Sequence, residues 1–292
     1  TGNKEKALEK LLELLDALEE ADTSRRAAQI DKDGNVTLSS EIPAGKPAAE
    51  KSAEDGTGES QPLYMSLNHV MEYYIFAYYF QPATEVRCTD IPYGEYYRTY
   101  GQLALSMQKY NGAKKAYERA IAWNPVDLDA YLGLAEVYKY QNQREKYLTV
   151  TKQAYRYCCT RATMARYYRN MAFYYLSGYE PETARACYQY SNVYYHTENA
   201  DSELKYISEA IQQETPQTDI RAIQKLFDEK QIEPGPDSQT IGIVYKVGEI
   251  LLKDGDYKLA KDCYSIVYDI TQDAAAEKML NELEAAISGS EE

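Results

Sequence analysis

Cysteine and histidine offer the widest metal and nucleophile chemistry in this sequence, and neither residue type is clustered. No two of the five cysteines have CxxC spacing, and no Cys/His group has the spacing of a zinc site. The two histidines each stand alone. We therefore expect no metal ion and no cofactor. The residues concerned are Cys88, Cys158, Cys159, Cys187, Cys263, His69 and His196.

Motifs that carry catalysis are also missing from the sequence. It has no G-x-S-x-G, P-loop, H-E-x-x-H or G-x-G-x-x-G pattern. Its Asp and Glu residues are interspersed with Lys and Arg, as on the solvated faces of helices. The adjacent Cys158 and Cys159 cannot both face one metal on a helix, so they indicate packing. We expect a protein that is not an enzyme.

Charge excludes two large classes of partner. The 292 residues carry 46 acidic and 32 basic side chains, for a net charge of −14. Nucleic acids and anionic membranes require a basic surface, so we expect neither as a partner. The apolar run 73–80 is too short to span a bilayer. Scattered thiols without a disulfide framework and no secretory segment at the start predict a cytoplasmic location.

The elements that would position any site are helix hairpins, and 97–125 is the clearest. Its first half has apolar or small residues at i, i+3 and i+7, and its second half at i, i+4 and i+7, which is the period of a helix face. Asn111-Gly112 separates the halves and Asn124-Pro125 ends the second. The residues on the two faces are Tyr97, Tyr100 and Ala104, then Ala113, Tyr117 and Ala120.

The same spacing recurs along the chain. A small residue precedes a second one by twelve positions, and a tyrosine follows four residues later. The three copies are Gly101, Ala113 and Tyr117; Ala172, Ala184 and Tyr188; Gly248, Ala260 and Tyr264. Cys187 and Cys263 fill the position that Ala116 has in the first copy. A further copy centres on Ala135, with Tyr147 in place of its second small residue, and the spacing leaves room for a divergent hairpin near 199–238.

The flanking segments have other patterns. Residues 1–22 predict an amphipathic helix whose leucine stripe, Leu8 to Leu18, docks on this chain or pairs with another. Residues 23–62 predict a linker with a small hairpin at 30–38 and a flexible stretch at 41–61. Residues 63–93 predict a capping helix and an extended lead-in to an array at 94–274. Residues 275–292 predict a C-terminal capping helix and tail.

This pattern resembles the tetratricopeptide repeat (TPR), a 34-residue helix hairpin. The first copy reads Tyr97-x2-Tyr100-Gly101-x2-Ala104, Ala113-x3-Tyr117, Ala120 and Pro125. The resemblance implies an all-α fold, a right-handed TPR-type α-solenoid of helix hairpins with N- and C-terminal capping helices. The run is also similar to uncharacterised bacterial TPR proteins, through Tyr168-Arg169-Asn170, Pro234-Gly235-Pro236-Asp237 and Val267-Tyr268-Asp269.

The resemblance further implies a ligand groove lined by the first helix of each repeat. Arg98 and Gln102 match by chemical kind the Lys and Asn with which TPR domains hold a peptide carboxylate. Alternatively, the arginines pair internally with Glu95, Asp129 and Glu136. The predicted groove residues are Arg98, Gln102, Lys139, Tyr140, Arg166, Arg169, Asn170, Phe173, Tyr245 and Lys246.

These expectations favour a non-enzymatic scaffold that binds a protein or peptide, with or without an anionic group, in the groove. Two other roles remain open: a peptide-responsive regulatory receptor, and self-assembly through the N-terminal helix. The oligomeric state does not follow from the sequence.

Overall fold

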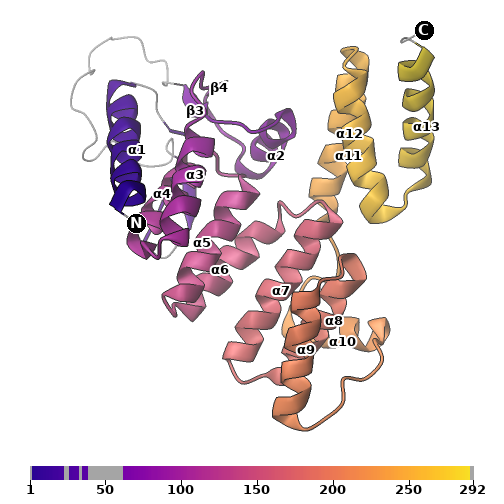
Figure 1. Cartoon of the computed structure of the whole chain (residues 1–292). Helices are drawn as coiled ribbons and strands as arrows, with labels where there is room; N and C mark the ends of the chain where they lie inside the picture. Colours follow the sequence, from indigo (N-terminus) through magenta and orange to yellow (C-terminus); the bar gives the residue numbers. More distant parts are fainter. Residues whose placement is uncertain (1, 23–25, 33–34, 39–61, 290–292) are drawn as a thin grey trace. The chain divides into compact units, whose positions relative to one another are not determined.

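A computed structural model describes residues 2–22, 26–32, 35–38 and 62–289 (Figure 1). These residues form thirteen helices and four three-residue strands. The chain divides into two compact units, unit 1 over residues 1–146 and unit 2 over residues 147–292. Each unit is described by itself. The linker expected at 41–61 lies outside the described residues.

Unit 1 contains the first helices and all the strands. Its elements are α1 (Gly2–Ala21), β1 (Ala28–Ile30), β2 (Val36–Leu38), β3 (Leu63–Met65), α2 (Val70–Phe80), β4 (Val86–Cys88), α3 (Tyr93–Ser106), α4 (Tyr110–Trp123) and α5 (Leu128–Tyr140). The unit boundary falls within α6 (Arg144–Tyr155). Unit 2 continues with α7 (Arg161–Ser177), α8 (Pro181–Tyr194), α9 (Glu198–Ile211), α10 (Ile220–Lys230), α11 (Ser238–Lys253), α12 (Tyr257–Thr271) and α13 (Ala274–Gly289).

Three helix pairs form the closely packed hairpins that the repeat spacing predicts: α3–α4, α7–α8 and α11–α12. Their small residues are required where the helices meet. A Cβ added to Gly101 would lie 2.9 Å from the Tyr117 ring, and one added to Gly248 would lie 3.0 Å from the Tyr264 ring. The repeated tyrosine therefore fills the space that the repeated glycine leaves, which confirms the packing role predicted for both.

Hairpin turns share a left-handed residue. It follows the small residue of the first helix by seven positions in every copy, and it has φ between 54° and 83°. The residues are Gln108, Asn142, Tyr179 and Gly255. Only the last is glycine, the residue that adopts this conformation without steric cost.

The leucine stripe of α1 docks on the chain's own body, the first of the two predicted alternatives. Leu8 and Leu15 are buried, and α1 packs on α3. Next to α1, β1 pairs antiparallel with β2, as the sequence predicts for 30–38, and β1 packs against α4. The predicted turn residues Asp33 and Gly34 lie outside the described residues.

A parallel strand pair, β3 with β4, brackets α2 and was not predicted. It joins the first hairpin through Ser66, whose N–H donates to the Trp123 carbonyl at 3.0 Å. The Ser66 hydroxyl in turn accepts from the Gly94 N–H at 2.9 Å. These bonds attach the segment before α3 to both ends of the α3–α4 hairpin.

The divergent repeat departs from a stacked hairpin. Both of its helices exist, as α9 and α10, but α10 packs on α8 and is not closely packed with α9. The eight-residue connection 212–219, which includes Pro216, separates them. The array boundaries and flanking segments predicted from the sequence stay predictions.

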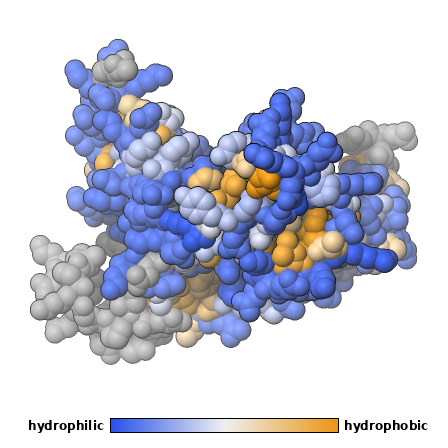
Figure 2. All heavy atoms as spheres, turned by 90° about the horizontal axis from the view of Figure 1, so that it is seen from below, coloured by the Kyte–Doolittle hydropathy of each residue, from blue (hydrophilic) through white to orange (hydrophobic). Residues whose placement is uncertain are grey.

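At the C-terminal end α13 packs on α12. Among the described residues, no helix has both the length and the apolar character needed to cross a membrane. The face drawn in Figure 2 is mostly hydrophilic, with apolar residues gathered in small patches.

Candidate functional site

One face of α7 carries four of the predicted groove residues. Arg166, Arg169, Asn170 and Phe173 follow one another at i, i+3, i+4 and i+7, so they share a side of the helix. The helix begins at a capping box, in which the Thr160 hydroxyl accepts from the Thr163 N–H and the Thr163 hydroxyl accepts from the Thr160 N–H. The cap fixes the first turn and hence the rotation of this face.

Arg166 and Arg169 lie close together without an acidic partner. Among the described residues, no carboxylate lies within ion-pair distance of either guanidinium. Burial lowers the pKa of Arg169, and the positive charge of Arg166 lowers it further. The Arg169 Nη1 makes one long contact, 3.5 Å, to the Tyr195 carbonyl. The chain has a net charge of −14, yet these two neighbouring arginines have no carboxylate partner among the described residues.

Asn170 adds unused hydrogen-bonding capacity beside the two arginines. Only 6% of this residue is exposed, yet its side chain makes no hydrogen bond within the part of the chain that the structure describes. The amide is not shut off from solvent, so a ligand can reach it. Its backbone carbonyl, in contrast, accepts from the Tyr147 hydroxyl at 3.1 Å. Arg166, Arg169 and Asn170, called the α7 site below, have the donors to hold a carboxylate or phosphate.

Arg161, at the start of α7, has a different role. Its Nε donates to the Tyr194 carbonyl at 3.0 Å and its Nη2 to the Val193 carbonyl at 2.7 Å. These carbonyls are at the C-terminal end of α8, where a cation is favourable. Arg161 therefore joins α7 to α8, and its guanidinium is already bonded.

In unit 1, Arg98 is bonded inside the protein. Its Nη1 lies 2.6 Å from the buried Asp127 carboxylate and 3.2 Å from the Asn68 side-chain oxygen. The internal pairing expected as an alternative is found, with Asp127 as the partner in place of Glu95, Asp129 or Glu136. Asp127 is also the N-cap of α5, where its side chain accepts from the Ala130 N–H.

The other predicted groove residues of unit 1 lie on α3 and α5. Gln102 is exposed on α3. Lys139 on α5 lies 3.8 Å from the Glu136 carboxylate. Tyr140, at the end of α5, is exposed and stacks on Tyr110 with ring centroids 5.5 Å apart.

Three predicted residues of unit 2 contact neighbours that the sequence did not identify. Phe173 meets Tyr147 edge to face, with ring centroids 5.3 Å apart. Tyr245 makes the same kind of contact with Tyr264 at 5.2 Å. Lys246 lies 2.8 Å from the Glu249 carboxylate and is largely exposed. Of the predicted groove residues in unit 2, those on α7 thus include two cations without an acidic partner among the described residues.

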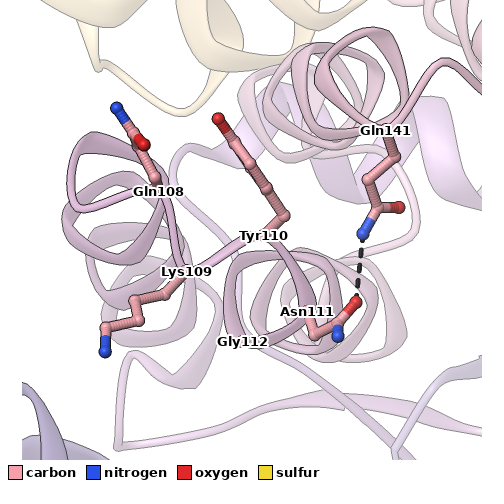
Figure 3. Close-up of a pocket in the computed structure, with 6 residues that line it drawn as sticks. All are labelled: Gln108, Lys109, Tyr110, Asn111, Gly112 and Gln141. Atoms are coloured by element: carbon pink, nitrogen blue, oxygen red, sulfur yellow. Dashed lines mark hydrogen bonds between the residues drawn. The ribbon is translucent and has the colours of Figure 1, made fainter.

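An open hollow of about 430 Å³ lies at the turn between α3 and α4 (Figure 3). The Gln141 Nε2 bridges to the Asn111 Oδ1 across it at 3.1 Å. None of the ten predicted groove residues lines the hollow. Its walls are the polar turn residues Gln108, Lys109, Tyr110, Asn111 and Gly112, together with Gln141.

The cysteines have the character of packing residues. All five are free thiols, and Cys158, Cys187 and Cys263 are buried. Burial raises the pKa of Cys159 to about 11 and that of Cys263 to about 12, so both stay protonated at neutral pH. In the described ranges no three His, Cys, Asp or Glu residues are grouped so as to hold a metal ion.

Comparison with known proteins gives one family match. A family model for the tetratricopeptide repeat matches residues 94–127. No curated protein matches the chain in sequence.

Three solved structures show a distant likeness. The chain is 14% identical to a chain of the APC/C hetero-tetramer Cut9–Hcn1, with a TM-score of 0.38, over 68% of this chain and 38% of that one. It is 15% identical to pilF of Pseudomonas aeruginosa, with a TM-score of 0.37, over 68% of this chain and 86% of that one. It is 14% identical to YrrB, described as a TPR protein with an unusual peptide-binding site, with a TM-score of 0.34, over 64% of this chain and 91% of that one.

The family match falls on α3, α4 and the turn into α5, the segment whose spacing defined the repeat. The same packing of a glycine on a tyrosine recurs in α11–α12, and α7 packs closely on α8. The described residues form an all-α fold of helix hairpins, and residues 94–127 of it match the tetratricopeptide-repeat model.

Proposed function

We propose that this protein is a non-enzymatic scaffold that binds a protein or peptide partner through the repeat helices of unit 2. The partner presents an anionic group, a carboxylate or a phosphate, to the α7 site. TPR-type hairpins expose the side chains of their first helices, and α7 is the first helix of its hairpin. In this role the protein supplies a binding surface and no reacting group.

The observation that carries the proposal is that Arg166 and Arg169 have no acidic partner among the described residues and lie beside the unbonded amide of Asn170. Two cations near each other repel, and the Asn170 amide beside them makes no hydrogen bond within the described residues. An anionic ligand would relieve this repulsion, since guanidinium groups bind carboxylate and phosphate by charge-assisted hydrogen bonds. The Asn170 amide could donate to the same ligand. Phe173, on the same face of α7, would add apolar contact to the partner.

A charge reversal tests the proposal. The variant Arg166→Glu with Arg169→Glu should lose the partners that a native pull-down of the full chain recovers. The matched control is Arg221→Glu with Lys225→Glu on α10, which makes the same change in net charge at two exposed positions in the same unit. The control should recover partners as the unchanged chain does.

Binding by these arginines should also weaken as salt is raised, because the contact is ionic. Equal recovery by the α7 variant and the unchanged chain contradicts the proposal, provided that both have the same helix content by circular dichroism. Loss of partners in both variants would indicate an effect of net charge alone and would also contradict it.

A further inference from the structure

The surface of α3 and α4 that contacts α1 presents several hydrogen-bond donors. α1 lies alongside α3 and α4 in Figure 1, and α1 packs on α3. Four side chains of α3 and α4 reach α1 with an O–H or N–H group: Tyr93, Tyr97, Arg119 and Trp123. We call these four residues the α1 seat. Each donates to a carboxylate at the C-terminal end of α1 or just beyond it.

The acceptors on the other side are regularly spaced. They are Asp16 and Glu19 on α1 and Asp22 just beyond its end, three residues apart in sequence. The Arg119 Nη1 is paired with Asp16. The Tyr93 hydroxyl lies 2.9 Å from the Asp22 Oδ2. The pattern of donors on the seat therefore matches a pattern of acids on the helix.

Glu19 is at the centre of this contact. Its Oε1 accepts from the Trp123 Nε1 at 2.9 Å and pairs with the Arg26 Nε at 2.7 Å. Its Oε2 accepts from the Tyr97 hydroxyl at 2.5 Å. A carboxylate bonded to three donors is held by charge-assisted hydrogen bonds, which are stronger than neutral ones. Glutamine at this position would keep the shape of the side chain and lose the charge.

The acids are placed where they oppose the helix itself. Asp16, Glu19 and Glu20 lie in the last turns of α1, and its last turn has no basic residue. The C-terminal end of a helix dipole is negative, so carboxylates there destabilise an isolated helix. The acidic end is thus favourable only when the seat neutralises it, which indicates that the seat selects for acid.

The apolar part of the contact is small. Of the stripe, Leu15 is 1% exposed and Leu8 is also buried, while Leu11, Leu12 and Leu18 are partly exposed. Two fully buried leucines give a twenty-residue helix little apolar area to stabilise its docking, so the ionic bonds carry much of the contact. On the seat, Tyr93, Tyr97 and Trp123 are almost fully buried with α1 in place.

We propose that the α1 seat is a recognition site for an acidic amphipathic helix, which α1 occupies in cis. The partner that fits it is a helix of another protein with carboxylates three residues apart and leucines on the adjoining face. This is helix-in-groove recognition, with the acids setting the register. It concerns a surface of unit 1 that is independent of the α7 site of unit 2.

Trp123 reports on the seat, because it is the only tryptophan in the chain and it donates to Glu19. In the full chain, Leu15→Asp should release α1 and shift the Trp123 emission to longer wavelength. The matched control is Leu14→Asp, the same change at the neighbouring exposed position, which should leave the emission unchanged.

A synthetic peptide of residues 2–22 is the probe for binding in trans. Added to the Leu15→Asp chain, it should restore the emission of the unchanged protein. The same peptide carrying Glu19→Gln should bind about tenfold more weakly, because it loses charged hydrogen bonds. If Leu15→Asp alters helix content beyond the loss of α1, Asp16→Asn with Glu19→Gln weakens α1 through the polar contacts alone and is used in its place.

Two results would overturn the proposal. One is a peptide that fails to restore the emission of either variant, or that binds equally well with and without the Glu19 charge. The other is a concentration-dependent dimer of the unchanged chain that dissociates in the Leu15→Asp variant by sedimentation, since the seat would then serve a second copy of this chain. Either result leaves the proposal for the α7 site unaffected.

Discussion

Gly133 shows how a single missing side chain permits the packing of two helices. The Tyr117 ring of α4 lies against α5 so closely that a Cβ added to Gly133 would be 2.3 Å from it. We predict that Gly133→Ala lowers the free energy of unfolding by about 1–3 kcal/mol, because the ring must move in a packed core. Gly242→Ala on α11 is the control: a Cβ there meets nothing within 4 Å, so it should stabilise by about 0.5–1 kcal/mol. Urea unfolding measures both changes.

Asp127 gives a second prediction for a single residue. Burial raises its pKa from 3.8 to about 6, while the positive charge of Arg98 acts in the opposite direction and Glu72 adds to the increase. The folded protein thus holds this proton at pH values where the unfolded chain has released it. The stability from this carboxyl is present below about pH 4 and is lost as the pH rises to about 6.

The charges around Asp127 provide the test. Arg98→Met should raise the pKa of Asp127 further, and Glu72→Gln should lower it, both measured by NMR titration of the side-chain carboxyl. Glu95→Gln, at an exposed position on α3, should leave it unchanged. An Asp127 titration near 3.8 in the unchanged protein, or the opposite order of the variants, would refute this account.

At the scale of the element, the hairpin turns differ in one instructive residue. Tyr179 in the α7–α8 turn has φ 62° and is 94% exposed, so its ring gains nothing from packing. Gly255, at the same place in the α11–α12 turn, has φ 83°. A side chain in this conformation costs about 1 kcal/mol, and glycine avoids the cost.

We therefore predict reciprocal effects of exchanging these residues. Tyr179→Gly should stabilise the protein by about 0.5–1 kcal/mol, and Gly255→Tyr should destabilise it by about 1 kcal/mol or more, both in thermal or urea unfolding. Tyr179→Ala separates the two causes: it removes the ring but keeps Cβ, and should give little gain. If Tyr179→Ala stabilised the protein as much as Tyr179→Gly, the cost would come from the ring and not from the backbone conformation.

Elements whose residues contact each other within one repeat were predictable. The twelve-residue spacing of Gly101 and Ala113 and the tyrosine that follows are set by one local packing rule, so the hairpins follow from it. The parallel pairing of β3 with β4 was not predictable, because two three-residue strands leave no periodic signal. The place of α10 was missed for a related reason: its amphipathic pattern predicts a helix but does not say which helix it covers.

The sequence predicted which residues of the candidate site share a helix face, but it did not predict the ion-pair partner of Arg98. Helical spacing placed Arg166, Arg169 and Asn170 on one face of α7. The partner of Arg98 was not among the acids expected, because Asp127 precedes α5 and reaches Arg98 only after the chain turns at Pro125. The N-cap position of Asp127 was the available signal, since it fixes that carboxylate at the start of the helix.

At the scale of the whole molecule, unit 2 is tied together by a chain segment that crosses back over earlier helices. After α10, the three successive carbonyls of Glu233, Pro234 and Gly235 each accept from a tyrosine hydroxyl of a different helix. The donors are Tyr168 of α7 at 2.9 Å, Tyr190 of α8 at 2.6 Å and Tyr155 of α6 at 2.9 Å. These bonds span 44 to 80 residues of sequence, so the segment holds the middle of unit 2 together where a stacked repeat was expected.

The last prediction concerns these three tyrosines together. Each change to phenylalanine should cost about 1 kcal/mol, because a carbonyl loses its donor while the ring is kept. Since the three bonds hold one short segment, that segment should detach as a unit once the first bonds are lost. The triple variant should therefore lower the free energy of unfolding by less than the sum of the single changes.

The control is Tyr206→Phe, at an exposed position on α9, which should leave the stability unchanged. Trp123 lies in unit 1, so its fluorescence does not report on this segment and hydrogen exchange is measured instead. The amide of Ile232 is bonded to the Phe227 carbonyl at 2.9 Å and should exchange faster in each variant. Strict additivity would show that the three bonds act independently and that the segment does not move as one piece.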